Sequence, residues 1–214
     1  MGLLERLATR RSDPGSEAGP PPLPEDPVFA TKALRKFLSS LLIREAPLLL
    51  DLGPVVGGNV NFFGEQLGCK IFVEDIFSDV DRHVRSEKLE DLPGFLGRRF
   101  PQSDSTFDGI LCWDLFDYLD RASAQALADQ LMRLLRLDGA LLGFFGNTQS
   151  HDVRYTKYII VDEVSLKYRR YPAARGRQAT LLNRDIIRLF PSLRVSDSFL
   201  LKNNTREILF RKLA

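Results

Sequence analysis

Residues 48–59 read LLLDLGPVVGGN, and this stretch decides the fold. Its three leucines predict a short strand that is apolar on both faces, as in a buried parallel sheet. A glycine-rich turn follows, and residues 59–67 then continue as a predicted helix. Glycines in such a turn let the backbone approach a ligand closely. The helix beyond it offers free N–H groups to an anionic group. The stretch therefore predicts a ligand pocket that opens after Asp51.

Strands and helices alternate outward from this turn. Hydrophobic periodicity predicts helices at 29–45, 59–67, 121–136 and 183–190. Asn183 is expected as the N-cap of the last helix, and Gly139 just past the end of the third. Predicted strands cover 48–51, 70–73, 107–115, 140–145, 194–201 and 206–211, whereas 76–106 gives no clear pattern.

The order of these elements predicts an α/β fold with a doubly wound, mostly parallel sheet. The last two strands are joined by a short polar turn, so they form an antiparallel hairpin. Ligands of such sheets bind outside the carboxyl ends of the strands, where the chain order changes direction.

Composition limits the class of protein. The chain has 214 residues and a formal net charge of +2, which argues against a protein devoted to coating nucleic acid. Cys69 and Cys112 lie in apolar runs, as expected of reduced, buried thiols in a cytoplasmic protein. The cysteines and histidines lack zinc-site spacing, so we expect no metal. No apolar run approaches the roughly 20 residues of a membrane span, so we expect no membrane partner.

Two segments stand apart from the rest of the chain. Residues 1–27 form an N-terminal segment that we expect to be flexible, because residues 12–27 are rich in Pro, Gly and acidic residues, and the domain covers 28–214. Residues 154–177 form an inserted hairpin that mixes basic side chains with tyrosines. Such a surface suits nucleic acid or another phosphate-bearing partner. The alternative, which we favour, is a lid over the pocket or a contact between the subunits of a homodimer.

A pair of acids follows the strand at 70–73. Glu74 and Asp75 lie about 20 residues after the glycine turn, where a carboxylate can accept hydrogen bonds from both ribose hydroxyls. The turn and the acids together predict a ribose-bearing cofactor, but they do not separate a dinucleotide from S-adenosylmethionine.

Four segments in order resemble class I S-adenosylmethionine-dependent methyltransferases. They are LDLG at 50–53 with Gly57 beyond it, STFDGIL at 105–111, CWDLFDYL at 112–119, and LLRLDGALL at 134–142. The resemblance covers roughly 48–145, and the terminal hairpin agrees in outline. It implies a Rossmann-like fold and a bacterial-type member with a divergent glycine motif. A nicotinamide-dependent oxidoreductase is disfavoured by that hairpin.

The resemblance also implies roles for particular residues. Asp51 would hold the amino group of S-adenosylmethionine, and Gly53 and Gly57 would let the backbone approach its methionine part. Glu74 or Asp75 would bind the ribose. Residues bordering the reacting methyl group would be Cys112 and Trp113.

Methyl transfer to a small or medium-sized acceptor is the implied function. The protein would mainly align a nucleophile with the methyl group. A general base helps where the nucleophile has a proton to lose. The candidate bases are Asp114, Asp117 and His151. The alternatives are that the two aspartates cap the following turn and that His151 is a surface loop residue.

The sequence departs from the family pattern in two places. Pro54, Val55 and Val56 fill the glycine turn, and Val55 adds a branched side chain where the cofactor should approach. This favours an alternative function, a non-catalytic interaction or cofactor-binding module with a methyltransferase fold. The family's third strand is not recognisable, and Glu90 or Asp91 are the candidates for its acid.

Overall fold

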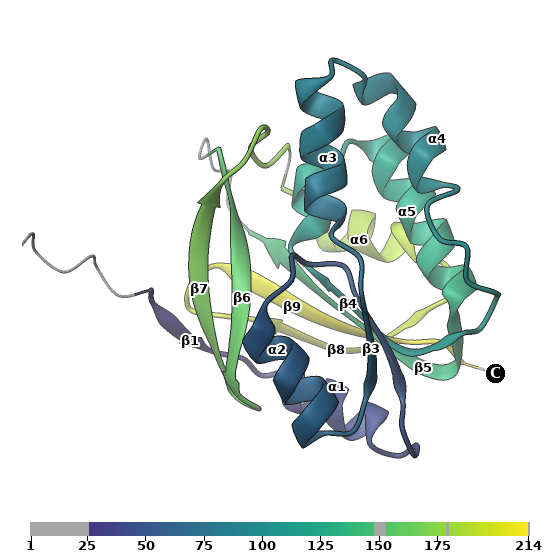
Figure 1. Ribbon diagram of the computed structural model, residues 1–214, viewed down its shortest axis with the longest axis vertical. Helices are drawn as coiled ribbons and strands as arrows, with labels where there is room; N and C mark the ends of the chain where they lie inside the picture. The colour runs from purple at the N-terminus through teal and green to yellow at the C-terminus, as the bar shows by residue number, and fades with distance from the viewer. Residues whose placement is uncertain (1–25, 148–152, 179, 214) are drawn as a thin grey trace, which may run out of the picture.

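Two β-sheets organise the chain in the computed structural model, which describes residues 26–147, 153–178 and 180–213 (Figure 1). The larger sheet has the strand order β3-β2-β4-β5-β9-β8 and the smaller one β1-β7-β6. The strands are β1 (Val28–Ala30), β2 (Leu48–Asp51), β3 (Lys70–Val73), β4 (Phe107–Trp113), β5 (Leu135–Gly146), β6 (Arg154–Asp162), β7 (Ser165–Pro172), β8 (Arg194–Leu200) and β9 (Thr205–Arg211).

The pairing confirms the predicted Rossmann-like sheet. Strands β3, β2, β4 and β5 are parallel neighbours. Strand β9 pairs antiparallel with both β5 and β8, which is the predicted terminal hairpin. After β2 the chain moves outward to β3 and then crosses back to β4 on the other side of β2. The carboxyl ends of β2 and β4 therefore meet at the point where the strand order changes direction.

Helices cover both faces of the larger sheet (Figure 1). They are α1 (Leu34–Leu41), α2 (Gly57–Asn61), which continues into a π-helical turn (Phe62–Gln66), α3 (Ile76–Arg85), α4 (Leu92–Leu96), α5 (Arg121–Leu134) and α6 (Asn183–Leu189). Two short 3₁₀ turns, η2 (Leu89–Asp91) and η3 (Leu115–Tyr118), lie between them. One apolar core combines α3, α4, α5 and α6, and the other combines α1 with β6 and β7.

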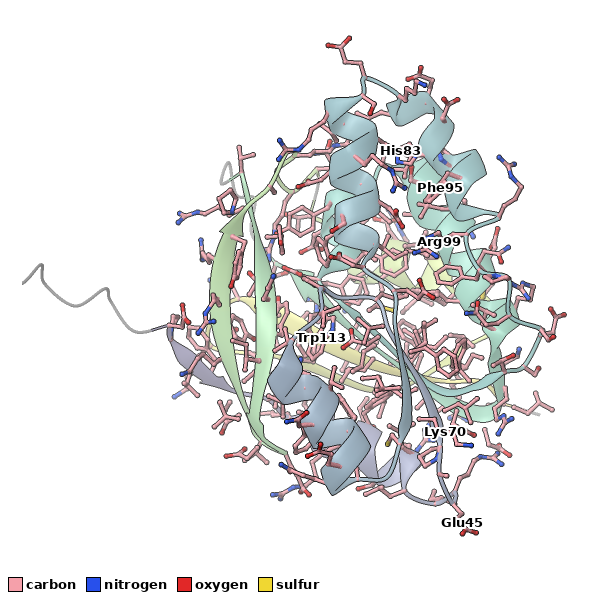
Figure 2. The ribbon with its side chains drawn as sticks, in the orientation of Figure 1. Glu45, Lys70, His83, Phe95, Arg99 and Trp113 are labelled. Atoms are coloured by element: carbon pink, nitrogen blue, oxygen red, sulfur yellow. The ribbon has the colours of Figure 1, made fainter. Side chains whose placement is uncertain are left out.

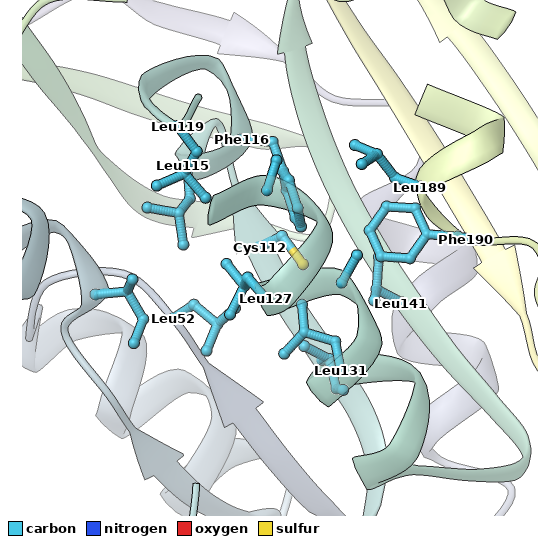
Figure 3. Packing of buried hydrophobic residues seen from close by; sticks show 14 of the residues in the cluster. Leu52, Cys112, Leu115, Phe116, Leu119, Leu127, Leu131, Leu141, Leu189 and Phe190 are labelled. Carbon is cyan, nitrogen blue, oxygen red and sulfur yellow. The ribbon is translucent and has the colours of Figure 1, made fainter. Parts of the chain in front are cut away.

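Strand β4 separates the two cores, because successive side chains of a strand point to opposite faces. Ile110 and Cys112 belong to the core under α5, where Figure 3 shows Cys112 close to Leu127. Leu111 and Trp113 belong to the core on the side of α1 and the β6–β7 hairpin. Trp113 and Cys112 are thus neighbours in sequence that face different layers.

Some boundaries differ from the predictions, and three of the differences have a clear structural basis. The expected helix 29–45 covers only Leu34–Leu41, because Val28–Ala30 pairs with β7. The third helix ends at Leu134 and β5 starts at the next residue, so Gly139 lies within a strand that is irregular here. Asn183 is the first residue of α6 rather than its cap. In the first two cases long-range strand pairing overrides the local helical pattern.

The segment without a clear pattern, 76–106, contains α3, η2 and α4 and no strand. Strand β3 is consequently an edge of the larger sheet. This agrees with the absence of a recognisable third strand in the sequence. Within the described ranges, no helix is both long and apolar enough to cross a bilayer.

Candidate active site

Asp51 and Trp113 meet where the carboxyl ends of β2 and β4 lie side by side. The indole Nε1 of Trp113 donates to Asp51 Oδ1 at 2.6 Å, and the Gly53 N–H donates to the same oxygen at 2.9 Å. Both side chains are buried. Figure 2 shows Trp113 in the middle of the molecule, near the start of α2. The sequence predicted both residues for the site, but not the bond between them.

Burial dominates the electrostatics of Asp51. It raises the pKa of this carboxyl to about 6, although the hydrogen bonds from Gly53 and Trp113 oppose the rise. The negative charge of Asp75 raises the pKa further, because the ends of β2 and β3 are adjacent. Two carboxylates therefore lie at the carboxyl ends of β2 and β3. Such an arrangement suits ligand groups that carry several N–H or O–H donors.

The glycines of the turn differ in the space beside them. A Cβ at Gly53 would lie 2.6 Å from the Trp113 ring, so the indole already occupies that space. A Cβ at Gly57 or Gly58 would meet nothing within 4 Å. Val55 is 65% exposed and therefore borders open solvent. Its expected contact with a cofactor stays a prediction.

Two side-chain hydrogen bonds from Asn59 hold the β6–β7 hairpin against this site. The Asn59 amide donates to the Tyr158 carbonyl at 2.8 Å, and its oxygen accepts the Ile160 N–H at 2.9 Å. The Tyr158 ring stacks on Trp113, with ring centroids 5.2 Å apart. Asn59 and Tyr158 are not recognisable as site residues from the sequence, since nothing local shows that they meet.

The two candidate ribose ligands have different partners. Glu74 forms an ion pair with Arg99 at 2.8 Å. Asp75 caps α3, where it accepts from the Ser78 N–H at 3.0 Å and the Ser78 hydroxyl at 2.6 Å. Asp75 is the one whose charge reaches Asp51, so it is the better placed for a ligand shared with the glycine turn.

The remaining predicted residues fall in different places. Cys112 packs in the core, where burial and, to a smaller extent, the charge of Asp51 raise its pKa well above the ordinary value, and its expected place beside the methyl group stays a prediction. His151 lies outside the described residues. Glu90 and Asp91 line a groove with His83, Phe95 and Arg99. Figure 2 labels the last three side chains near α3 and α4.

Asp114 and Asp117 are brought together by Arg177. The guanidinium lies 3.0 Å from Asp114 Oδ2 and 3.5 Å from Asp117 Oδ2. The Gly146 N–H, at the end of β5, donates to Asp117 Oδ2 at 2.7 Å. Neither aspartate caps a turn with its side chain, since the cap of α5 is Asp120. The alternative interpretation of the two aspartates as caps is therefore wrong.

Burial again controls the acidity of this pair. It raises the pKa of Asp117 to about 8, where Arg177 opposes the rise and Asp114 adds to it. Burial also raises the pKa of Asp114, against Arg177 and the neighbouring Tyr158 hydroxyl. Burial alone would lower the pKa of Arg177, but the two carboxylates outweigh it and raise that pKa.

Charged side chains of the hairpin region point in two directions. Arg177 turns inward to the two aspartates, whereas Arg169 lies at the surface and pairs with Asp26.

The described residues contain no cluster of three or more His, Cys, Asp or Glu arranged to hold a metal ion.

Solved structures share this fold. The PH0226 protein from Pyrococcus horikoshii OT3 matches with a TM-score of 0.50 and 15% identity, over 83% of this chain and 88% of its own. The CcbJ methyltransferase from Streptomyces caelestis matches with a TM-score of 0.49 and 14% identity over 94% of each chain. The 1,6-didemethyltoxoflavin-N1-methyltransferase from Burkholderia thailandensis, solved with S-adenosylhomocysteine, has a TM-score of 0.49 and 14% identity, over 85% and 79%.

No family model and no curated protein matches the sequence. At identities of 14–15% the likeness concerns the fold alone. The strand order and the PH0226 match show a Rossmann-like α/β fold.

Proposed function

We propose that this protein binds S-adenosylmethionine at the carboxyl ends of β2, β3 and β4 and transfers its methyl group to a small or medium-sized acceptor. The observation that supports this most directly is that Asp51 and Asp75 lie at the ends of adjacent parallel strands, beside an open turn at Gly57 and Gly58. In a methyltransferase fold, carboxylates and bare backbone at this edge suit a ligand with an amino group and a ribose.

Each residue has a definite task in this proposal. Asp75 would accept the ribose hydroxyls in place of the Ser78 hydroxyl that it now binds. Gly57 and Gly58 leave room for the methionine end. The hairpin held by Asn59 excludes water from the site. When bound, the cofactor supplies a methyl group on a positively charged sulfur that is already activated for transfer.

Calorimetry with S-adenosylmethionine and S-adenosylhomocysteine tests the proposal. Asp75→Asn should weaken binding at least tenfold, and the helix should survive because Asn is also a good N-cap. Asp120→Asn is a matched control, since Asp120 caps α5 through Ser123 in the same way as Asp75 caps α3. At a ligand concentration 100 times Kd, binding adds about 2.7 kcal/mol of stability, which raises Tm by several degrees.

One observation favours the second candidate, a non-catalytic module with this fold. The Trp113 ring lies against Gly53 and takes one oxygen of Asp51, so part of the expected cofactor space is filled by the protein itself. Absence of heat and of any Tm shift at millimolar ligand would contradict the first proposal. Trp113→Phe, which is smaller and removes the indole donor from that oxygen, separates the two. Binding gained in this variant identifies the ring as a block, and binding weakened identifies it as part of the pocket wall.

A further inference from the structure

Two buried carboxylates form a cage beside the proposed cofactor site. Asp114 follows β4 directly, Asp117 lies in η3, and Gly146 ends β5. Asp114 and Asp117 are 0% and 1% exposed. Since Trp113 is the preceding residue and stacks on Tyr158, whose hydroxyl neighbours Asp114, the cage continues the site around Asp51.

Arg177 occupies this cage from the segment after β7. Its guanidinium contacts both carboxylates, at 3.0 Å and 3.5 Å. Glycine at position 146 leaves room for the cation, because a Cβ there would collide with the guanidinium and lie 2.9 Å from Asp117 Oδ2. The segment is attached nearby through the Gln178 N–H, which donates to the Asp117 carbonyl at 2.7 Å.

The cage has capacity that Arg177 does not use. Asp117 Oδ1 is buried and has no hydrogen-bond partner among the described residues. A buried carboxylate oxygen without a donor is costly, and a further N–H would relieve that cost. Guanidinium and ammonium groups carry the charge and the several N–H donors that such a cage requires.

We propose that Asp114 and Asp117 bind the amine or guanidine group of the acceptor, and that Arg177 is an internal occupant which the acceptor displaces. The binding site stands on its own geometry, whereas its use in methylation rests on the function proposed above. In that use the acceptor nitrogen gives a proton to the Asp114 carboxylate and forms a bond to the methyl carbon. The carbon–sulfur bond breaks and its electron pair remains on sulfur.

Titration with ethylguanidinium, which reproduces the end of an arginine side chain, tests the site without any cofactor. The wild-type protein should bind it saturably but weakly, because Arg177 competes. Arg177→Gln removes the competitor and should tighten binding at least tenfold. Adding Asp114→Asn to that variant should reverse the gain. Arg175→Gln, in the same segment but paired at 3.8 Å with Asp120, is the matched control and should bind like wild type.

Ethylurea is the control ligand, because it has nearly the same shape and no charge. Binding of ethylurea as tight as that of ethylguanidinium would overturn the proposal. So would an Arg177→Gln variant that binds no tighter than wild type. Amide exchange gives a readout in the wild-type chain itself. Displacement of Arg177 should speed exchange of the Gln178 N–H, which now bonds to Asp117, and unchanged exchange at saturation would refute displacement.

The two proposals fail separately. Binding of S-adenosylmethionine without binding of ethylguanidinium would remove the acceptor assignment and leave methyl transfer standing. Binding of ethylguanidinium without the cofactor would leave a cation site in a protein that is not a methyltransferase.

Discussion

Replacing Asp117 with Asn should abolish most of the pH dependence of stability between pH 6 and pH 8. Asp117 is buried and shares one guanidinium with Asp114, and burial raises its pKa to about 8. In the unfolded chain an aspartate titrates near pH 4. Between about pH 4 and pH 8 the folded protein therefore holds roughly one proton more than the unfolded chain.

The sign and size of the effect follow from that extra proton. Stability contributed by a carboxyl with a raised pKa is fully present below the unfolded pKa and is lost as the pH rises through the folded one. One proton gives a slope of at most about 1.4 kcal/mol per pH unit. From pH 6 to pH 8 the wild-type protein should lose about 2 kcal/mol, because titration is only half complete at pH 8. The amide of the Asp117→Asn variant does not titrate. The variant should therefore lose only a few tenths of a kcal/mol of stability, which come from the end of the Asp51 titration.

Urea unfolding followed by circular dichroism at pH 6, 7 and 8 measures these slopes. Asp104→Asn is the control, because the Asp104 side chain is 78% exposed and its pair with Arg133 lies at the surface. It should keep the wild-type slope. Equal slopes in wild type and Asp117→Asn, or a wild-type stability that does not change over this range, would refute the reasoning.

Two further predictions concern the packing around the site. Asn59→Ala leaves a buried N–H and C=O of β6 without partners and should cost about 2–4 kcal/mol, with faster exchange of the Ile160 amide. The exposed Asn61→Ala should change neither quantity, and equal effects of the two would contradict the role of Asn59. Gly109→Ala places a Cβ 2.9 Å from a phenylalanine ring of α1 and should cost about 1–3 kcal/mol. Urea unfolding compares it with Gly64→Ala, whose Cβ meets nothing within 4 Å. An unchanged free energy of unfolding in Gly109→Ala would show that α1 can move away from β4.

Much of the scaffold could be predicted because its signals are local. The strand 70–73 and the terminal antiparallel hairpin agree with the structure closely. A short run of mostly apolar residues between turns, or two such runs joined by a short polar turn, allows few backbone arrangements. The helix predicted at 29–45 was partly wrong, because β7 recruits Val28–Ala30 into a sheet from more than 130 positions away.

The candidate site could likewise be predicted only in part. The sequence by itself determined which residues end the strands of the sheet, and so it placed Asp51, Asp75 and Trp113 at one edge. Only the tertiary structure decided what those side chains do there. Trp113 bonds to Asp51 and fills the space beside Gly53, and Arg177 reaches Asp114 across 63 positions. Neighbouring residues restrict the backbone of a strand or turn, whereas the partner of a buried polar group depends on which distant segments pack against it.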